Sequence, residues 1–207
     1  MDFVRPHRPV SLGLVSGKGH YETVIRAVRE ARTSVWIATA NLKELMVEDL
    51  RWTSRRRFGK TAYRSILGVF AELCAAGVDL RILHAAAPSR PFLAQARASG
   101  IEDMLRLRRR MCPRVHLKAV IVDGSFLYLG SANWTGAGLG AKGTGRRNFE
   151  IGIVTDDALL LDDVQELFDR IWRGAECGAC RLRDVCPRPL DLPPKVRSTA
   201  AGGRRAC

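Results

Sequence analysis

Apolar residues follow two spacings along the chain, and each spacing predicts one kind of secondary structure. Stretches in which they recur every three to four residues predict helices, over residues 21–32, 61–76, 91–99 and 156–172. Short apolar runs rich in β-branched residues predict strands, over residues 34–39, 79–84, 115–122, 126–129 and 149–154. Because strands and helices alternate, we expect an α/β sandwich in which a mixed β-sheet carries helices on both faces.

Turn-forming residues mark the ends of several predicted elements. Gly77 follows a helical stretch, as a helix-terminating glycine does, and Asp123-Gly124 between two strands is a strong hairpin signal. From residue 187 onward, proline, serine, threonine and paired glycines replace any periodicity, which is typical of disorder. We therefore expect four regions: an N-terminal arm (1–17), one α/β domain (18–173), a cysteine-containing segment (174–186) and a disordered basic tail (187–207).

Length and composition narrow the class of protein. The chain has 207 residues, 46% of them apolar, which is enough for one domain with a buried core and an appendage. No apolar run approaches the roughly 18 residues of a membrane span, and residues 1–17 lack the apolar core of a signal peptide. These features argue against a small secreted disulfide protein, a transmembrane protein and an acidic disordered chain. We expect a cytoplasmic protein with no transmembrane segment.

The net charge of +13 makes polyanions the expected partners, either nucleic acid or an anionic membrane surface. Arginine outnumbers lysine 28 to 6, which is also what a GC-rich coding bias produces, so composition alone decides little. The positions of the charges say more, because they gather in three clusters. The first interleaves Arg51, Arg55, Arg56, Arg57 and Lys60 with Trp52 and Phe58; the others are Arg106, Arg108, Arg109, Arg110 and Arg114, and then Arg146 and Arg147.

The last two clusters enclose a spaced set of polar residues. The order is His116-x-Lys118, four residues, Asp123, six residues, and then Gly130-Ser131-x-Asn133. This pattern resembles the HxK(x)4D(x)6GSxN signature of the phospholipase D superfamily, in a single copy. The resemblance extends over roughly residues 18–173, because the order of helices and strands before the motif and Asn148-Phe-Glu150 after it are similar to one repeat of that family.

The residue types fit phosphodiester chemistry without reference to any family. His116 and Lys118 are two apart on a predicted strand, so their side chains share a face, and the hairpin brings Ser131 and Asn133 back beside them. Lys118 and Asn133 are suitable donors to the phosphate oxygens, and imidazole acts as nucleophile or proton donor near neutral pH. Because no cluster of metal ligands accompanies them, we expect catalysis without a metal cofactor.

Each of these residues also has an ordinary structural interpretation. Taken alone, His116 is typical of a core histidine whose ring nitrogens are hydrogen-bonded, and Lys118 is typical of a charged residue at a strand edge. Ser131 suits a turn, and Asp123 suits the shaping of the hairpin or the fixing of a neighbouring group better than contact with phosphorus. The complete spaced set favours the functional interpretation.

The family resemblance implies a two-step mechanism with two motif copies. One His116 attacks phosphorus to give a phosphohistidine, a second histidine protonates the leaving oxygen, and Glu150 orients the imidazole. Since this chain has one copy, we expect a homodimer that shares one active site. The expected catalytic residues are His116, Lys118, Asp123, Ser131, Asn133 and Glu150, and the expected phosphate-binding residues are Lys118, Asn133, Arg110, Arg114 and Arg147.

Three cysteines, Cys177, Cys180 and Cys186, form a C-x2-C-x5-C pattern after the last predicted helix. The pattern suggests a structural metal site that lacks one ligand, holding zinc or an iron–sulfur cluster. The spacing is similar to the cysteine trio that holds such a cluster in some RecB-like nucleases. Cys112 is the favoured fourth ligand and Cys207 its rival, while plain reduced thiols are the alternative.

Three functions follow from these features. The leading one is a metal-independent endonuclease that cleaves nucleic acid. The second is a phospholipase acting on phosphatidyl or cardiolipin head groups, for which an apolar rim would be supplied by Leu45, Met46, Val47, Leu50 and Trp52. The third is a DNA-binding regulator with a vestigial site, against which the complete motif argues.

Overall fold

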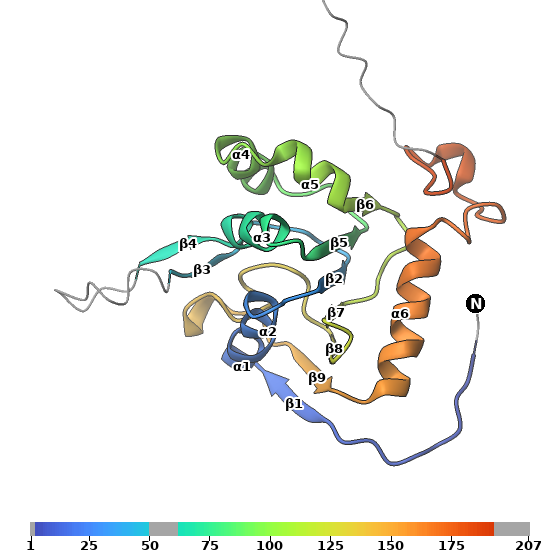
Figure 1. Ribbon diagram of the computed structural model, residues 1–207, viewed down its shortest axis with the longest axis horizontal. Coiled ribbons are helices and arrows are strands. Elements are labelled where there is room, and N and C mark those ends of the chain that lie inside the picture. The colour runs from blue at the N-terminus through green and yellow to red at the C-terminus, as the bar shows by residue number, and fades with distance from the viewer. Residues whose placement is uncertain (1–2, 50–61, 193–207) are drawn as a thin grey trace, which may run out of the picture.

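The computed structural model describes residues 3–49 and 62–192 (Figure 1). Its main feature is a seven-stranded sheet in the order β1-β9-β8-β7-β2-β5-β6. The strands of this sheet are β1 (Gly13–Ser16), β2 (Ser34–Thr39), β5 (Asp79–His84), β6 (Arg109–Met111), β7 (Ala119–Val122), β8 (Phe126–Gly130) and β9 (Ile151–Thr155). A separate pair is formed by β3 (Met46–Glu48) and β4 (Tyr63–Ser65).

The sheet is mixed, as the sequence predicts. Strands β2, β5 and β6 run parallel to one another, and the remaining neighbours pair antiparallel. The parallel strands are joined by helical crossovers, whereas β7 and β8 form a hairpin. The carboxyl ends of β2 and β5 therefore meet at one edge of the sheet, with Thr39 beside His84.

Helices cover both faces of the sheet, so the predicted sandwich is confirmed (Figure 1). One face packs against the helical run from α1 to α2 and against α3, α4 and α5, and the other face packs against α6. The bounds are α1 (Lys18–His20), the π-helical segment η1 (Tyr21–Ile25), α2 (Arg26–Arg29), α3 (Ile66–Ala75), α4 (Arg90–Ala98), α5 (Glu102–Arg108), α6 (Ala158–Trp172) and the 3-10 turns η3 (Thr144–Arg146) and η4 (Arg183–Val185).

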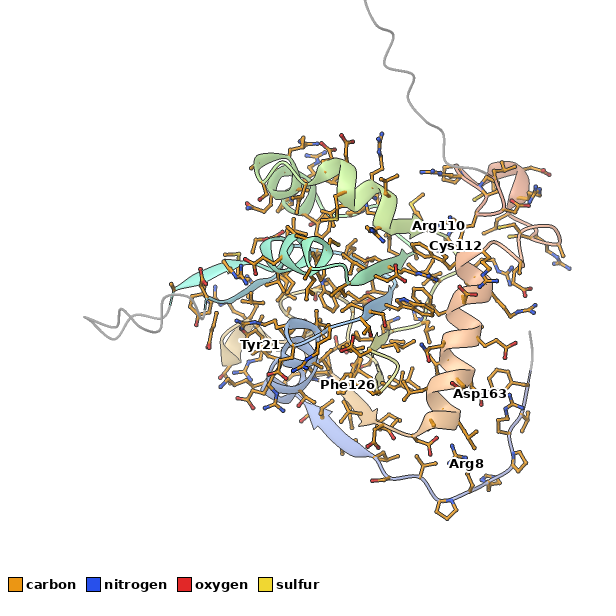
Figure 2. The ribbon with its side chains drawn as sticks, in the orientation of Figure 1. Arg8, Tyr21, Arg110, Cys112, Phe126 and Asp163 are labelled. Atoms are coloured by element: carbon orange, nitrogen blue, oxygen red, sulfur yellow. The ribbon has the colours of Figure 1, made fainter. Side chains whose placement is uncertain are left out.

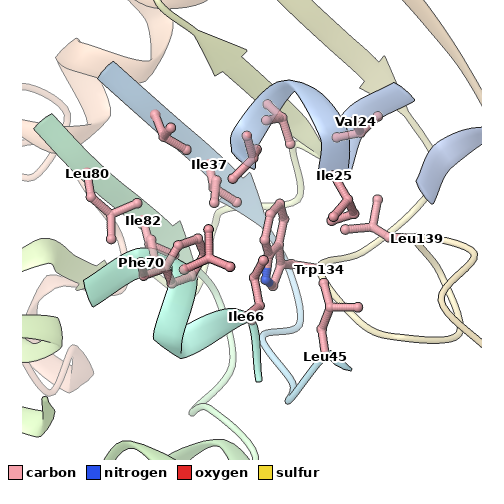
Figure 3. Packing of buried hydrophobic residues seen from close by; sticks show 14 of the residues in the cluster. Val24, Ile25, Ile37, Leu45, Ile66, Phe70, Leu80, Ile82, Trp134 and Leu139 are labelled. Carbon is pink, nitrogen blue, oxygen red and sulfur yellow. The ribbon is translucent and has the colours of Figure 1, made fainter. Parts of the chain in front are cut away.

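The larger core lies on the face opposite α6 (Figure 3). Trp134 stacks on Phe70 with 5.7 Å between ring centroids, and both side chains are fully buried. Ile37 of β2 and Leu139 belong to the same cluster. Large apolar side chains from the sheet, from α3 and from the loop after β8 thus fix that loop in place, and each contributes about 1.5–3 kcal/mol by burial.

Several predicted elements need correction. The helix predicted over 61–76 begins only at Ile66, because Ser65 caps it by accepting from the Leu67 N–H at 3.0 Å while its preceding residues pair in β4. The strand predicted over 115–122 begins at Ala119. Apolar periodicity is weak in short elements, and it gave no sign of β1, β3, β6 or α5.

The expected N-terminal arm is partly built into the domain. Residues 13–16 form β1, which pairs with β9 at the sheet edge. The segment before it runs along α6, where Arg8 donates to Asp157 at 2.8 Å and Arg5 to Asp163 at 3.0 Å; Figure 2 labels Arg8 and Asp163. No helix in the described parts of the chain is long and apolar enough to cross a membrane.

Candidate active site

Apart from Asp123, the motif residues lie where the hairpin of β7 and β8 opens, at the sheet edge that also holds the carboxyl ends of β2 and β5. The Gly130 N–H donates to the Lys118 carbonyl at 3.2 Å, and the Ser131 N–H donates to the Ile151 carbonyl at 3.0 Å. These bonds extend the ladder past β7 and join the segment before it to β8 and β9. In α/β folds this kind of edge is where ligands bind.

His116 and Lys118 lie side by side before β7. The Lys118 Nζ is 3.2 Å from Nε2 and 3.3 Å from Nδ1 of His116, and it donates to the His116 carbonyl at 2.8 Å. His116 is exposed and Lys118 is half-buried. The strand alternation that the sequence implies thus places an ammonium group against an accessible imidazole.

Asn133 is fixed by its carbonyl oxygen. This Oδ1 accepts from the Thr39 hydroxyl at 3.3 Å and from the backbone N–H groups of Ala40 and Asn41, both at 3.1 Å. Because the oxygen is occupied, the amide nitrogen is the group left to donate to a ligand. Buried Trp134, whose backbone N–H donates to the Thr39 hydroxyl at 2.9 Å, anchors the same segment. Thr39 is a positioning residue that the sequence reasoning missed, since it ends an apolar strand without other signal.

Ser131 and Glu150 contact each other. The Ser131 hydroxyl donates to Glu150 Oε2 at 2.5 Å, and the Asn148 amide donates to Oε1 at 3.0 Å. The family resemblance led us to expect Glu150 beside the His116 imidazole. Among the described residues the two carboxylate oxygens instead accept from Ser131 and Asn148, and no hydrogen bond joins Glu150 to the His116 imidazole.

Asp123 lies at the closed end of the hairpin, away from the other motif residues. Its carboxylate accepts from the backbone N–H groups of Arg32, Thr33 and Ser34 at 2.8–3.1 Å and from the Thr33 hydroxyl at 3.0 Å. Burial opposes its ionisation, but the hydrogen bonds from Ser34, Thr33 and Arg32 prevail and lower its pKa. These contacts support the structural interpretation of Asp123, the shaping of the hairpin, over a catalytic role.

Gly130 is required by close packing. A Cβ there would lie 2.7 Å from the Ile151 carbonyl oxygen and 2.8 Å from the Gly152 Cα, closer than any side chain permits. The ring of buried Tyr128 fills the same space, and its hydroxyl accepts from the Ala132 N–H at 3.3 Å. Gly130 thus lets β9 approach the turn that carries Ser131 and Asn133.

The arginines expected to bind phosphate contact other groups. Arg110 donates to the Trp172 carbonyl at 2.6 Å and stacks over the Trp172 ring, with 4.8 Å to its centroid. Arg114 hydrogen-bonds to Cys180. Arg147 donates to the Lys142 carbonyl at 2.8 Å and to the Thr144 hydroxyl at 3.0 Å, which closes its own loop. Charge along the sequence did not reveal these partners. The cluster from Arg51 to Lys60 lies outside the described residues.

The cysteines form a second group, apart from the motif. Cys112, Cys177, Cys180 and Cys186 line a single cavity, so the structure brings the favoured fourth cysteine to the other three. The rival, Cys207, lies outside the described residues. Across residues 3–49 and 62–192, no three His, Cys, Asp or Glu side chains are already arranged around a common metal position.

Comparison with known proteins agrees with the α/β fold. The family model described as "Cardiolipin synthase, PLD-like domain" matches residues 24–172. No curated protein matches the chain. Among solved structures, a phospholipase D family member, Nuc from Salmonella typhimurium, superposes with a TM-score of 0.54 at 18% identity over 79% of this chain and 95% of its own. NucT from Helicobacter pylori gives 0.51 at 15% identity over 78% and 95%.

The sandwich, the HxK segment at the sheet edge and the matched domain together define a phosphodiesterase. The chain belongs to the phospholipase D superfamily, because the family model covers 149 residues (24–172) of its 207.

Proposed function

We propose that this protein hydrolyses phosphodiester bonds of nucleic acid through a covalent phosphohistidine on His116, without a catalytic metal. The observation that carries the proposal is the exposed His116 imidazole within 3.3 Å of the Lys118 ammonium, at the open edge of the sheet. A positive charge at this distance from the ring attracts a phosphate to the imidazole.

The first step uses groups of both protomers. An imidazole nitrogen of one His116 attacks phosphorus, the bond from phosphorus to the leaving oxygen breaks, and that oxygen takes a proton from the His116 of the second copy. The Lys118 ammonium and the Asn133 amide nitrogen donate to the phosphoryl oxygens as their charge grows. In the second step the now neutral second histidine takes a proton from water, which attacks phosphorus and releases His116.

Glu150 and Ser131 serve as positioning residues in this scheme. Their 2.5 Å hydrogen bond ties β9 to the turn of the motif, and Asn148 holds the other carboxylate oxygen. Glu150→Gln removes the charge and keeps the shape, so we expect activity to fall by about tenfold to a hundredfold with the fold intact. A pH–rate profile with an altered acidic limb would show that Glu150 acts on the titrating groups; an unchanged profile would assign it to structure alone.

The homodimer is supported by a surface beside the site. Leu14 of β1 is 70% exposed, Ile151 of β9 is 56% exposed, and Phe149 next to Glu150 is fully exposed. Register places Leu14 and Ile151 on the same face of the sheet edge. An apolar patch adjoining an active site is typical of an interface. We propose that a twofold axis near this patch brings two His116 side chains together.

The dimer is tested by Phe149→Glu combined with Ile151→Glu. We expect a folded monomer with no hydrolytic activity, measured by light scattering and by cleavage. Leu159→Glu is the matched control, because Leu159 is 60% exposed on α6 and lies outside the proposed interface. A double variant that is monomeric and fully active would overturn the shared site.

Nucleic acid is favoured over lipid by the burial of the proposed apolar rim. Leu45 is 1% exposed and Val47 is fully buried, so both belong to the core, and of the described rim residues only Met46 reaches the surface. Leu50 and Trp52 lie outside the described residues. The net charge of +13 suits a polyphosphate backbone. The cardiolipin-like description of the family model keeps phospholipid as the second candidate.

The cleavage experiment separates these candidates. Supercoiled plasmid, an RNA oligonucleotide and cardiolipin vesicles are incubated separately with the protein in EDTA. We expect cleavage of nucleic acid that persists with the chelator, weakens as salt rises, is lost in His116→Ala and is retained in His7→Ala, whose exposed histidine lies on the arm. Release of phosphatidate from vesicles with intact nucleic acid supports the lipid enzyme. Salt-sensitive DNA binding without any hydrolysis supports the regulator.

The cytoplasm is the proposed compartment. All five cysteines in the described residues are free thiols, which suits a reducing environment.

A further inference from the structure

The four-cysteine cavity joins two distant segments. Cys112 comes from the turn after β6, and Cys177, Cys180 and Cys186 come from the segment after α6. The cavity has a volume of about 20 Å³, close to that of one small ion or water. The other lining residues are largely apolar: Met111, Pro113, Arg114, Leu182, Arg183, Pro189 and Leu190. Figure 2 labels Cys112 near the end of α6 that leads into the cysteine segment.

Backbone N–H groups are directed at the sulfur atoms. The Leu190 N–H donates to Cys177 Sγ at 3.3 Å. The Leu182 N–H donates to Cys180, and the Arg114 N–H donates to Cys112. Such bonds are stronger to a thiolate than to a thiol, because the charge of the acceptor strengthens them. Three of the four cysteines are thus surrounded as metal-bound thiolates are.

Positive charge lies where a thiolate site needs it. Four thiolates around a divalent cation carry a net charge of two minus, and the guanidinium groups of Arg114 and Arg183 line the cavity, the latter ion-paired with Asp191 at 2.7 Å. The Arg114 side chain hydrogen-bonds to Cys180 as well. This charge balance lowers the cost of holding thiolates in apolar surroundings.

We infer that Cys112, Cys177, Cys180 and Cys186 bind one Zn²⁺ ion. Binding releases four thiol protons and forms four Zn–S bonds of about 2.3 Å in a tetrahedron, with no change of oxidation state. As placed in the described residues, no three of these side chains are close enough to hold a metal ion, so the four sulfur atoms must move inward when zinc binds. The ion-sized cavity favours a single metal over an iron–sulfur cluster.

The site holds the C-terminal segment against the strand that enters the motif. Cys112 lies four residues before His116, and its N–H donates to the His84 carbonyl at 2.9 Å at the end of β5. Zinc would cross-link this junction to the residues after α6. The role is structural, and it is independent of the proposed hydrolysis.

Zinc content tests the inference. The tag-free, full-length protein is expressed in zinc-supplemented medium and analysed by mass spectrometry for metals. We expect one zinc per chain in the wild type and in Cys74→Ser, whose cysteine lies on α3, and less than a tenth of that in Cys112→Ser and Cys180→Ser. Replacement by Co²⁺ should give sulfur-to-cobalt charge-transfer bands. Zinc removal should lower the melting temperatures of the wild type and of Cys74→Ser and leave those of Cys112→Ser and Cys180→Ser unchanged.

Several results would overturn the inference. They are a wild type without zinc, equal zinc in wild type and the Cys112→Ser and Cys180→Ser variants, stoichiometric iron with sulfide, or disulfides among these cysteines in freshly purified protein. Zinc content and hydrolysis are measured on the same samples, so that the two proposals can fail separately. Zinc should be present in His116→Ala as in the wild type. A wild type that holds zinc but hydrolyses no substrate would support the metal site and contradict the proposed hydrolase.

Discussion

The hairpin of β7 and β8 carries motif residues at both ends, and the two ends are built for different purposes. At the closed end, the Asp123 carboxylate accepts hydrogen bonds from backbone N–H groups just before and at the start of β2. At the open end, the hydrogen bonds recorded for the His116 ring go to the Lys118 ammonium alone among the described residues. One sequence motif therefore contains a structural clamp and the proposed chemical site, separated by the length of a strand.

The largest expected difference between the two ends is in catalysis. His116→Ala removes the nucleophile and should reduce phosphodiester cleavage by at least about a thousandfold. Its free energy of unfolding should change by less than about 0.5 kcal/mol, since the side chain is exposed. Cleavage kinetics and urea unfolding measure the two quantities. Residual activity near the wild-type level would end the proposal for His116.

The second difference is in stability. Asp123→Ala leaves the N–H groups of Arg32, Thr33 and Ser34 without their acceptor, and we expect a loss of about 2–3 kcal/mol. Folded protein should cleave substrate at a rate of the wild-type order. Urea unfolding is the measurement, with exposed Asp162→Ala as the control. A stable but inactive Asp123→Ala would move this residue into the chemistry.

Substitution of one glycine at each end of the hairpin tests whether the two ends have different roles. Gly130→Ala forces a Cβ against backbone atoms of Ile151 and Gly152, so we expect a loss of about 1–3 kcal/mol together with loss of activity. Gly124 has φ +62° and open space around it, so Gly124→Ala should cost a similar amount, about 1–2 kcal/mol, and leave activity unchanged. Matched unfolding and cleavage assays compare the two variants. Equal activity losses in the two variants would contradict a structural role for the closed end and a catalytic role for the open end.

The smallest expected effect is on the pH dependence of folding stability, through Asp123 at the closed end of the hairpin. Because the folded-state pKa of Asp123 is lowered, its contribution to stability is present above the unfolded pKa of about 3.9 and is lost as pH falls through the folded pKa. Asp123→Asn should therefore show a shallower loss of stability in acid than the wild type. Urea midpoints between pH 6 and pH 3 test this, and parallel curves would show that another group causes the acid sensitivity.

Buried, strongly patterned segments were predictable from the sequence. The runs that form β2 and β5 have the predicted bounds, because each is an apolar, β-branched stretch buried in the centre of the sheet. The edge strands β1 and β6 were missed, since edge positions tolerate polar residues and give little pattern. The placement of Lys118 beside His116 was predictable because residues two apart in extended backbone project from the same face.

Partners of long side chains were not predictable. The arginines around the motif looked alike in sequence, yet Arg110 contacts the end of α6 and Arg114 contacts Cys180. Likewise, Val47 belongs to the core although its neighbours suggested an exposed rim. These outcomes depend on which segments meet in space.

The class of fold and the family followed from the sequence alone, because periodicity and motif spacing are local properties of a chain. Only the tertiary structure decided that Asp123 clamps the hairpin, that Glu150 bonds to Ser131 and that Cys112 meets the three later cysteines. The physical reason is that a hydrogen bond or a shared cavity is set by distances between segments far apart in sequence. Those distances follow from the packing of the whole core.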